Sequence, residues 1–236
     1  MTDMLLERLE AAVATRDLLT HPYYQSWSMG TLTIGDLQAY AAQYRHQVEA
    51  LPKLLRAARG QAPDVLAVHA VQRNLEEEEG RAAPEGGLAE PHAELWDRFA
   101  QGIGGGQADA TPATRAAAES LASLVREGPI EALAALWAYE AQTARVSATK
   151  RAGLIERYGV RDQRALGFFA VHEKLDVHHA ADLLACLRRA CRSEADVDRA
   201  CAAALRSAEA QWAFLDGVEA SRLSASSRPA LPAAGT

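Results

Sequence analysis

Apolar residues recur along the chain at intervals of three and four positions, and they do not alternate with polar residues over any long run. This spacing is the period of an amphipathic α-helix, whereas half-buried strands would show strict alternation between turn signals. Valine, isoleucine, threonine and aromatic residues never gather into alternating runs of that kind. The pattern therefore predicts an all-α chain.

Proline, glycine and capping residues set the expected helix boundaries. Thr33 and Asp36, for example, form a capping-box pair at the start of a long helix, and Pro52 is an expected kink inside it. Eight helices are expected, over residues 3–19, 34–60, 63–79, 91–101, 112–126, 129–159, 162–189 and 193–223. Together they predict one helical-bundle domain of residues 1–223. The Ser-, Pro- and Ala-rich tail of residues 224–236 is expected to be disordered.

Composition narrows the class of protein. With 49% hydrophobic and 24% charged residues among 236, the chain can bury a sizeable core. No long uncharged apolar segment predicts a membrane span, and the acidic N-terminus does not resemble a secretory signal. A net charge of −6 argues against a nucleic-acid partner. Three cysteines without CxxC spacing suit reduced thiols, so we expect a cytoplasmic protein.

The most informative segment lies in the seventh expected helix. His172, Asp176 and His179 stand at i, i+4 and i+7, and Leu183 and Leu187 continue the same row. The leucines indicate that this face of the helix is buried. Burying two imidazoles and a carboxylate there is unfavourable unless these groups bind a partner. A metal ion is the commonest partner for that combination. The alternative is a surface helix on which these side chains form ordinary i,i+4 pairs.

Two further helices carry carboxylates on apolar stripes. Glu140 continues a stripe that begins at Leu133 with i, i+3, i+4, i+7 spacing. Glu78 continues a stripe that begins at Val68, and this spacing distinguishes it from the other glutamates of residues 76–79. Those other three are expected to form a solvated face.

His92 adds a third imidazole, in the first turn of a helix with an apolar side. Three carboxylates and three imidazoles then come from four helices, which is how helical bundles build carboxylate-bridged dimetal sites. The ligand set has nitrogen and oxygen donors but no cysteine, and it therefore favours iron or manganese over structural zinc. The residue types do not distinguish an iron–iron from a manganese–iron pair.

A series of motifs gives the chain a family resemblance. They are His21-Pro22-Tyr23-Tyr24 with Trp27 and Gly30, Asn74-Leu75-x-Glu-Glu, His92-x-Glu-Leu-Trp96, Tyr139-Glu140, and His172-x3-Asp176-x2-His179. The chain resembles the haem-oxygenase-like dimetal oxidases from about Leu18 to Gly217, and within them the CADD-like relatives of the pyrroloquinoline-quinone synthase C family. The resemblance implies a bundle of seven or eight helices around two metal ions. It assigns the ligands to Glu78, His92, Glu140, His172, Asp176 and His179. Because the connection before His92 is longer than the family pattern, the choice between Glu77 and Glu78 stays open.

The resemblance also implies an activity. CADD-like proteins are associated with making 4-aminobenzoate, a folate precursor, from one of their own tyrosines with a lysine as amino donor. Tyr24 and Lys150 occupy the matching positions, and Tyr40 and Tyr139 are further catalytic candidates. Dioxygen would be the co-substrate, and an external reductant would supply electrons. Without the resemblance, Lys150 would be interpreted as a solvated lysine near a helix end, roughly 80° from the row of Glu140.

Two other functions are compatible with the sequence. A related oxidase could act on a diffusible small molecule, in which case Tyr24 and Lys150 would only line the cavity. A metal-free helical binding or interaction protein could use the buried polar row as a hydrogen-bond network. The alanine-rich last helix, with Trp212 and Phe214, is in addition a candidate homodimer surface.

Overall fold

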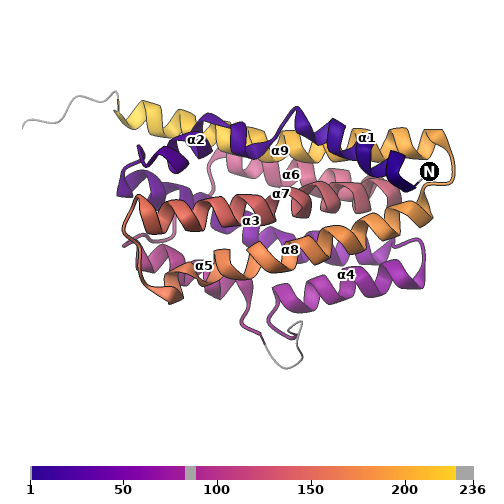
Figure 1. Cartoon of the computed structure of the whole chain (residues 1–236), viewed down its shortest axis with the longest axis horizontal. Helices are drawn as coiled ribbons and strands as arrows, with labels where there is room; N and C mark the ends of the chain where they lie inside the picture. The colour runs from indigo at the N-terminus through magenta and orange to yellow at the C-terminus, as the bar shows by residue number, and fades with distance from the viewer. Residues whose placement is uncertain (1, 83–88, 227–236) are drawn as a thin grey trace, which may run out of the picture.

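The structure is a computed structural model that describes residues 2–82 and 89–226. All regular secondary structure in these two ranges is helical (Figure 1). The elements are α1 (Thr2–Ala14), a 3-10 helix η1 (Leu18–Thr20), α2 (Pro22–Met29), α3 (Ile34–Gly60), α4 (Val65–Glu78), α5 (His92–Gly102), α6 (Pro112–Glu127), α7 (Pro129–Glu156), α8 (Gln163–Ala190) and α9 (Glu194–Ser226). The predicted all-α class is confirmed.

The prediction of one helix over residues 3–19 is wrong, because α1 ends at Ala14 and two short elements follow. The side chain of Asp17 accepts a hydrogen bond from the Leu19 amide and starts η1. His21 then caps α2, since its Nδ1 accepts from the Tyr23 amide at 3.1 Å. Pro22 at the first helical position is a usual start signal, but a helix of 8 residues is too short to show a clear apolar period, which is why the sequence did not reveal α2.

The longer helices agree with their predicted boundaries to within a few residues. The capping box of Thr33 and Asp36 is present at the start of α3, and this helix continues through Pro52. The last helix extends to Ser226, three residues into the segment expected to be disordered. Residues 227–236 of that segment lie outside the described residues, as do residues 83–88 between α4 and α5.

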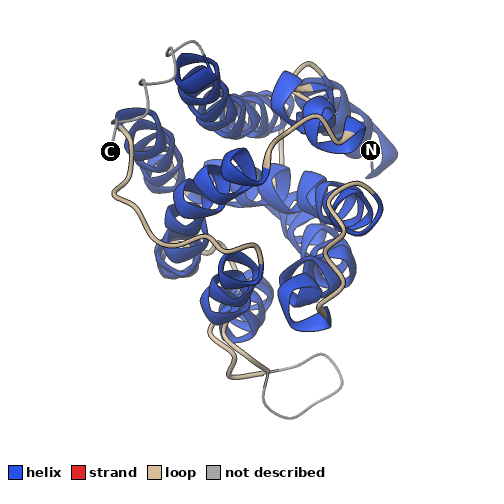
Figure 2. Cartoon of the chain, turned by 90° about the vertical axis from the view of Figure 1, so that its left-hand side faces the viewer, coloured by secondary structure: helices blue, strands red, loops and turns tan. Residues whose placement is uncertain are grey.

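The helices run along a common long axis, as the side and end views show (Figures 1 and 2). Helix α7 packs against α6, α8 and α9 and is buried over most of its length. Its sequence is rich in alanine, whose small side chain lets neighbouring helices approach closely. Within the described ranges, no helix combines the length and hydropathy that crossing a membrane requires.

The apolar core consists of two clusters of buried side chains. Along α8, Phe168 and Phe169 belong to one cluster, whereas Leu183 and Leu187 belong to the other. The polar row of residues 172–179 lies between them in the sequence of this helix. A layer of buried polar groups therefore separates two apolar regions.

The last helix contributes to both clusters, and its two aromatic residues differ in burial. Phe214 is only 3% exposed and packs inside the chain, whereas Trp212 is partly exposed and packs against the ring of His21. The expected homodimer surface on this helix stays a prediction.

Candidate metal centre

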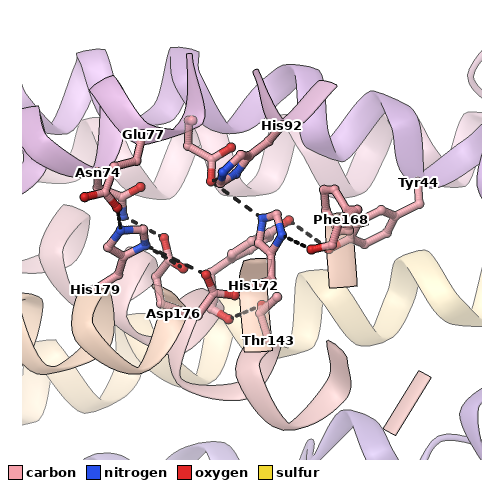
Figure 3. A network of polar contacts seen from close by, with 12 residues as sticks. Tyr44, Asn74, Glu77, His92, Thr143, Phe168, His172, Asp176 and His179 are labelled. Carbon is pink, nitrogen blue, oxygen red and sulfur yellow. Dashed lines mark hydrogen bonds and ion pairs between the residues drawn. The ribbon is translucent and has the colours of Figure 1, made fainter. Parts of the chain in front are cut away.

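Six buried side chains from α4, α5, α7 and α8 converge in the polar layer (Figure 3). Each is at most 4% exposed. They form two groups, and within each group one ligand atom of every residue lies within 4.8 Å of the others. The groups are Glu78, His92 and His172, and Glu140, Asp176 and His179. These are the six residues that the sequence singled out.

In the first group, two imidazoles face one carboxylate oxygen. His92 Nδ1 lies 2.8 Å from Glu78 Oε1, and His172 Nε2 lies 3.8 Å from the same oxygen. The other ring nitrogen of His172, Nδ1, is 2.7 Å from the Phe168 carbonyl oxygen, to which it donates. This hydrogen bond places the proton on Nδ1 and leaves the Nε2 lone pair facing Glu78.

In the second group, one imidazole faces two carboxylates. His179 Nδ1 lies 3.7 Å from Glu140 Oε2 and 3.8 Å from Asp176 Oδ1. Its Nε2 lies 2.7 Å from Glu77 Oε2 and donates to that carboxylate. The amide of Asn74 donates to Glu140 Oε1 at 2.8 Å. The remaining lone pairs of the group therefore point toward one another.

Several of these buried atoms have no hydrogen-bond partner among the described residues. They are both carboxylate oxygens of Asp176 and His179 Nδ1, whereas Glu78 Oε1 and His92 Nδ1 have each other at 2.8 Å. An unpartnered carboxylate is strongly unfavourable in a protein interior, and a cation bound to it removes that penalty. Imidazole nitrogens and carboxylate oxygens are also a donor set that iron and manganese accept. The residues present therefore fit a pair of transition-metal ions.

The electrostatics of the two groups differ. Burial and the neighbouring Glu140 carboxylate raise the pKa of Asp176 well above its usual value. Burial also acts to raise the pKa of Glu78, but His92 and His172 outweigh it and the net pKa is lowered. Burial acts to lower the pKa of His179, but Glu140, Glu77 and Asp176 outweigh it and raise this pKa well above its usual value. A proton on His179 therefore balances part of the negative charge in the place that a metal cation would take.

The junction of α4 and α5 brings Glu78 against His92. Gly80 adopts a left-handed conformation with φ of 69°, and a Cβ atom there would lie 2.5 Å from the backbone nitrogen of Pro91. Only glycine permits this approach without strain. The close contact sets the end of α4 beside the first residue of α5.

The expectation that Glu77 lies on a solvated face is wrong, because Glu77 is 5% exposed and accepts from His179. Glu76 and Glu79 are partly exposed. The end of α4 contacts both α5 and α8, so two adjacent positions about 100° apart on the helix can both be buried. In the sequence, Asn74 is part of a family motif and Glu77 is an alternative ligand to Glu78, but no pattern indicates that both side chains bond to members of the second group.

A second buried cluster surrounds Lys150, which is 4% exposed. Its Nζ atom donates to the Tyr40 hydroxyl and lies 4.3 Å from the centroid of the Tyr24 ring. The hydroxyls of Tyr24 and Tyr40 are 2.9 Å apart. No ion pair joins Lys150 to a carboxylate in the described part of the chain, and burial holds the pKa of this amine well below its usual value. The interpretation of Lys150 as a solvated lysine is therefore wrong.

Ring contacts connect the two clusters. Tyr40 stacks on Tyr44 with centroids 5.4 Å apart, and Tyr44 lies 4.7 Å from Trp96. Trp96 is 4.7 Å from Phe168, whose ring stacks on His172 at 3.9 Å. The cluster around Lys150 is thus in continuous aromatic contact with the candidate metal centre.

A small cavity lies beside Tyr24, Tyr44 and Tyr139, and its volume is about 20 Å³. The hydroxyls of Tyr44 and Tyr139 are 3.2 Å apart at this place. Such a volume holds about one water molecule. It is too small for a diffusible aromatic molecule.

Comparisons with known proteins complete the description of the site. Residues 38–212 match a haem-oxygenase-like family whose members are described as iron-containing redox enzymes. The chain is 31% identical to a Nitrosomonas europaea protein named 4-aminobenzoate synthase, over 92% of each chain. It is 32% identical to a Chlamydia muridarum protein of the same name, over 89% of this chain and 88% of the relative.

Solved structures share the fold at lower identity. A CADD-like protein of unknown function from Nostoc punctiforme has a TM-score of 0.76 and 20% identity, covering 93% of this chain and 97% of that one. A TenA homologue from Pseudomonas syringae has a TM-score of 0.75 and 16% identity, covering 92% of each chain. At these identities, the likeness concerns the arrangement of the helices.

Proposed function

Because the chain belongs to the haem-oxygenase-like family of iron-containing redox enzymes, we propose that it makes 4-aminobenzoate from its own Tyr24, with Lys150 as amino donor. Membership of this family confirms three expectations from the sequence: the family resemblance carried by the motifs, the haem-oxygenase-like fold, and the enzyme class of oxidoreductase. The identity of the substrate and of the amino donor, the metals and the self-consuming reaction form the proposal.

The six converging side chains would hold two metal ions, either iron–iron or manganese–iron. Such a pair supplies redox equivalents and open coordination positions for dioxygen, with an external reductant as the source of electrons. The chain contributes the arrangement of ligands, because the hydrogen bonds of His172 and His179 direct one lone pair of each ring inward. The apolar clusters on either side exclude water from the centre.

The position of Lys150 over the Tyr24 ring carries the proposal. In 4-aminobenzoate, the nitrogen stands para to the carbon that bears the carboxyl group, which is where tyrosine carries its hydroxyl. The Lys150 amine and the Tyr24 hydroxyl both contact the hydroxyl of Tyr40. The amino donor is therefore held beside the position of the ring that it would occupy. Burial also lowers the pKa of Lys150 and favours the uncharged, nucleophilic amine.

The ring and the amine need no diffusional encounter, and this positioning alone corresponds to a large effective concentration. The small cavity beside Tyr24 further favours an internal substrate over a diffusible aromatic one. Tyr40 positions the amine, and Tyr139 borders the cavity next to the ligand Glu140. A protein that consumes its own side chain reacts once per polypeptide.

The test is a single-turnover experiment. Reduced, metal-loaded protein exposed to dioxygen without an aromatic substrate should release at most about one 4-aminobenzoate per chain. Tyr24→Phe and Lys150→Arg should each suppress the product. The matched controls are Tyr158→Phe, whose ring contacts Trp27 rather than Tyr24 or Lys150, and Lys174→Arg on the surface of α8, and both should leave the yield unchanged. Release of many products per chain from an added small molecule, with Tyr24→Phe still active, would instead establish a conventional oxidase.

A further inference from the structure

The two groups of the candidate metal centre differ in the charge of their ligands and in the residues that hydrogen-bond to those ligands. We infer that Asn74 and Glu77 are positioning residues that make the group of Glu140, Asp176 and His179 the tighter metal position. The two positions would then fill in sequence. This inference rests on the proposed function, since it requires that both groups bind metal.

The first difference is in the charge of the ligands. The group of Glu78, His92 and His172 has one carboxylate and two imidazoles, whereas the group of Glu140, Asp176 and His179 has two carboxylates and one imidazole. Both groups are almost completely buried, so the Coulomb energy of a divalent ion with each carboxylate is only weakly screened. The second group therefore attracts a cation more strongly.

The second difference is in the partner of each histidine. His172 donates its outward N–H to the backbone carbonyl of Phe168, which is uncharged. His179 donates its outward N–H to the carboxylate of Glu77 at 2.7 Å. A carboxylate partner fixes the ring orientation and increases the basicity of the inward nitrogen, which strengthens its bond to a metal. Glu77 thus adds negative charge to the second group without being placed among its ligand atoms.

Asn74 acts on the same group. It is 2% exposed and lies one helical turn before Glu77. Its amide donates to Glu140 Oε1, while Glu140 Oε2 faces His179 Nδ1. One oxygen of Glu140 is therefore held by the protein and the other is left for the metal. The last turns of α4 contribute a ligand to one group, through Glu78, and the supporting hydrogen bonds to the other (Figure 3).

A titration of the full metal-free chain with Mn²⁺, followed by calorimetry and electron paramagnetic resonance, tests the inference. The wild-type protein should bind two ions in two steps, with an isolated Mn²⁺ signal at one equivalent and a magnetically coupled pair at two. Glu77→Gln removes the charge and keeps a hydrogen-bond acceptor. It should weaken the tighter step about 10- to 100-fold and leave the weaker step within about threefold.

Further variants show which group of ligands is responsible for each of the two Mn²⁺-binding steps. Glu76→Gln removes the same charge one position earlier, on a partly exposed side chain, and should leave both steps unchanged. His92→Ala should keep the tighter step, and Asp176→Ala should lose it. Asn74→Ala weakens the tighter step by a route that does not involve Glu77, and it decides the matter if Glu77→Gln fails to fold.

Two outcomes overturn the inference. One is equal weakening of both steps, or of neither, in folded Glu77→Gln and Asn74→Ala. The other is a tighter step that survives in Asp176→Ala. Failure of the proposed function looks different: without a dimetal centre the wild-type chain would bind no Mn²⁺ at either position, whereas failure of the self-consuming reaction alone would leave both binding steps unchanged.

Discussion

The candidate metal centre and the cluster around Lys150 are neighbouring buried polar regions with opposite electrostatic needs. The candidate metal centre holds three buried carboxylates, and both oxygens of Asp176 have no hydrogen-bond partner among the described residues, so that a cation is needed to balance them. The other cluster holds one amine among the rings of Tyr24, Tyr40 and Tyr44, and no carboxylate of residues 2–82 or 89–226 is paired to it. Burial therefore favours a bound cation in the first region and an uncharged amine in the second. The proposed reaction, a metal-dependent oxidation with a nucleophilic nitrogen, needs these two environments side by side.

The largest effect is expected from removing a ligand of the candidate metal centre. His172→Ala or Asp176→Ala removes an inward ligand atom and should abolish tight binding at the group to which that residue belongs, so that the variant holds at most one ion tightly. Metal analysis of protein purified without chelator measures this. His178→Ala is the control, since His178 is exposed and adjacent to His179. Undiminished metal content in both ligand variants would show that the row of α8 does not bind metal.

The second prediction concerns the charge of Lys150. Its lowered pKa means that the folded chain binds fewer protons than the unfolded chain between that pKa and the usual value of about 10.4. The free energy of unfolding should therefore rise with pH in this window, by about 1.4 kcal/mol for each unit of pKa shift in total. In Lys150→Met this contribution is absent.

Urea denaturation of metal-free wild-type protein and of Lys150→Met, between neutral pH and about pH 10, measures the difference in slope. Comparing slopes separates titration from any change in packing at the substituted position. Lys174→Met serves as a control, because Lys174 is exposed. Parallel pH profiles for wild type and Lys150→Met would mean that the amine is charged in the folded protein.

A smaller effect is expected at the junction of α4 and α5, which supports only the metal centre. Gly80→Ala strains a left-handed residue and brings a Cβ against Pro91, so it should destabilise the protein by about 1–3 kcal/mol. It should also weaken metal binding by Glu78 and His92. The pH dependence that Lys150 contributes should stay as in the wild type.

Gly60→Ala is the matched control, because nothing lies within 4 Å of a Cβ atom at that position. That variant should be neutral or stabilised by up to about 1 kcal/mol. Thermal unfolding and Mn²⁺ titration of both variants distinguish the outcomes. If Gly80→Ala also removed the pH dependence that Lys150 contributes, the junction of α4 and α5 would support both regions and the prediction would be wrong.

The same comparison shows what the sequence could predict. The candidate metal ligands follow helical stripes, and a stripe is a property of one helix that does not depend on how its neighbours pack. For that reason Glu78, Glu140 and the row of α8 could be found before the fold was known. Glu77 could not, because its burial requires α5 and α8 to meet on two sides of α4.

The burial of Lys150 could not be predicted from the periodicity of apolar residues either. It lies off the row of Glu140, and its burial depends on Tyr24 of α2 and Tyr40 of α3. The short helix α2 was itself not predicted, since its 8 residues are too few to show a clear apolar period. Only the family resemblance indicated Lys150, and the structure then supplied the geometry.

The central claim is that the product ring comes from Tyr24, and isotope labelling tests it most directly. Protein made with ring-labelled tyrosine should be loaded with reduced metal and exposed to dioxygen, and both the released product and the peptide containing Tyr24 should be analysed by mass spectrometry. The account predicts labelled 4-aminobenzoate and a Tyr24 peptide that has lost its side-chain mass in equal amount. Unlabelled product together with an intact Tyr24 peptide would contradict it.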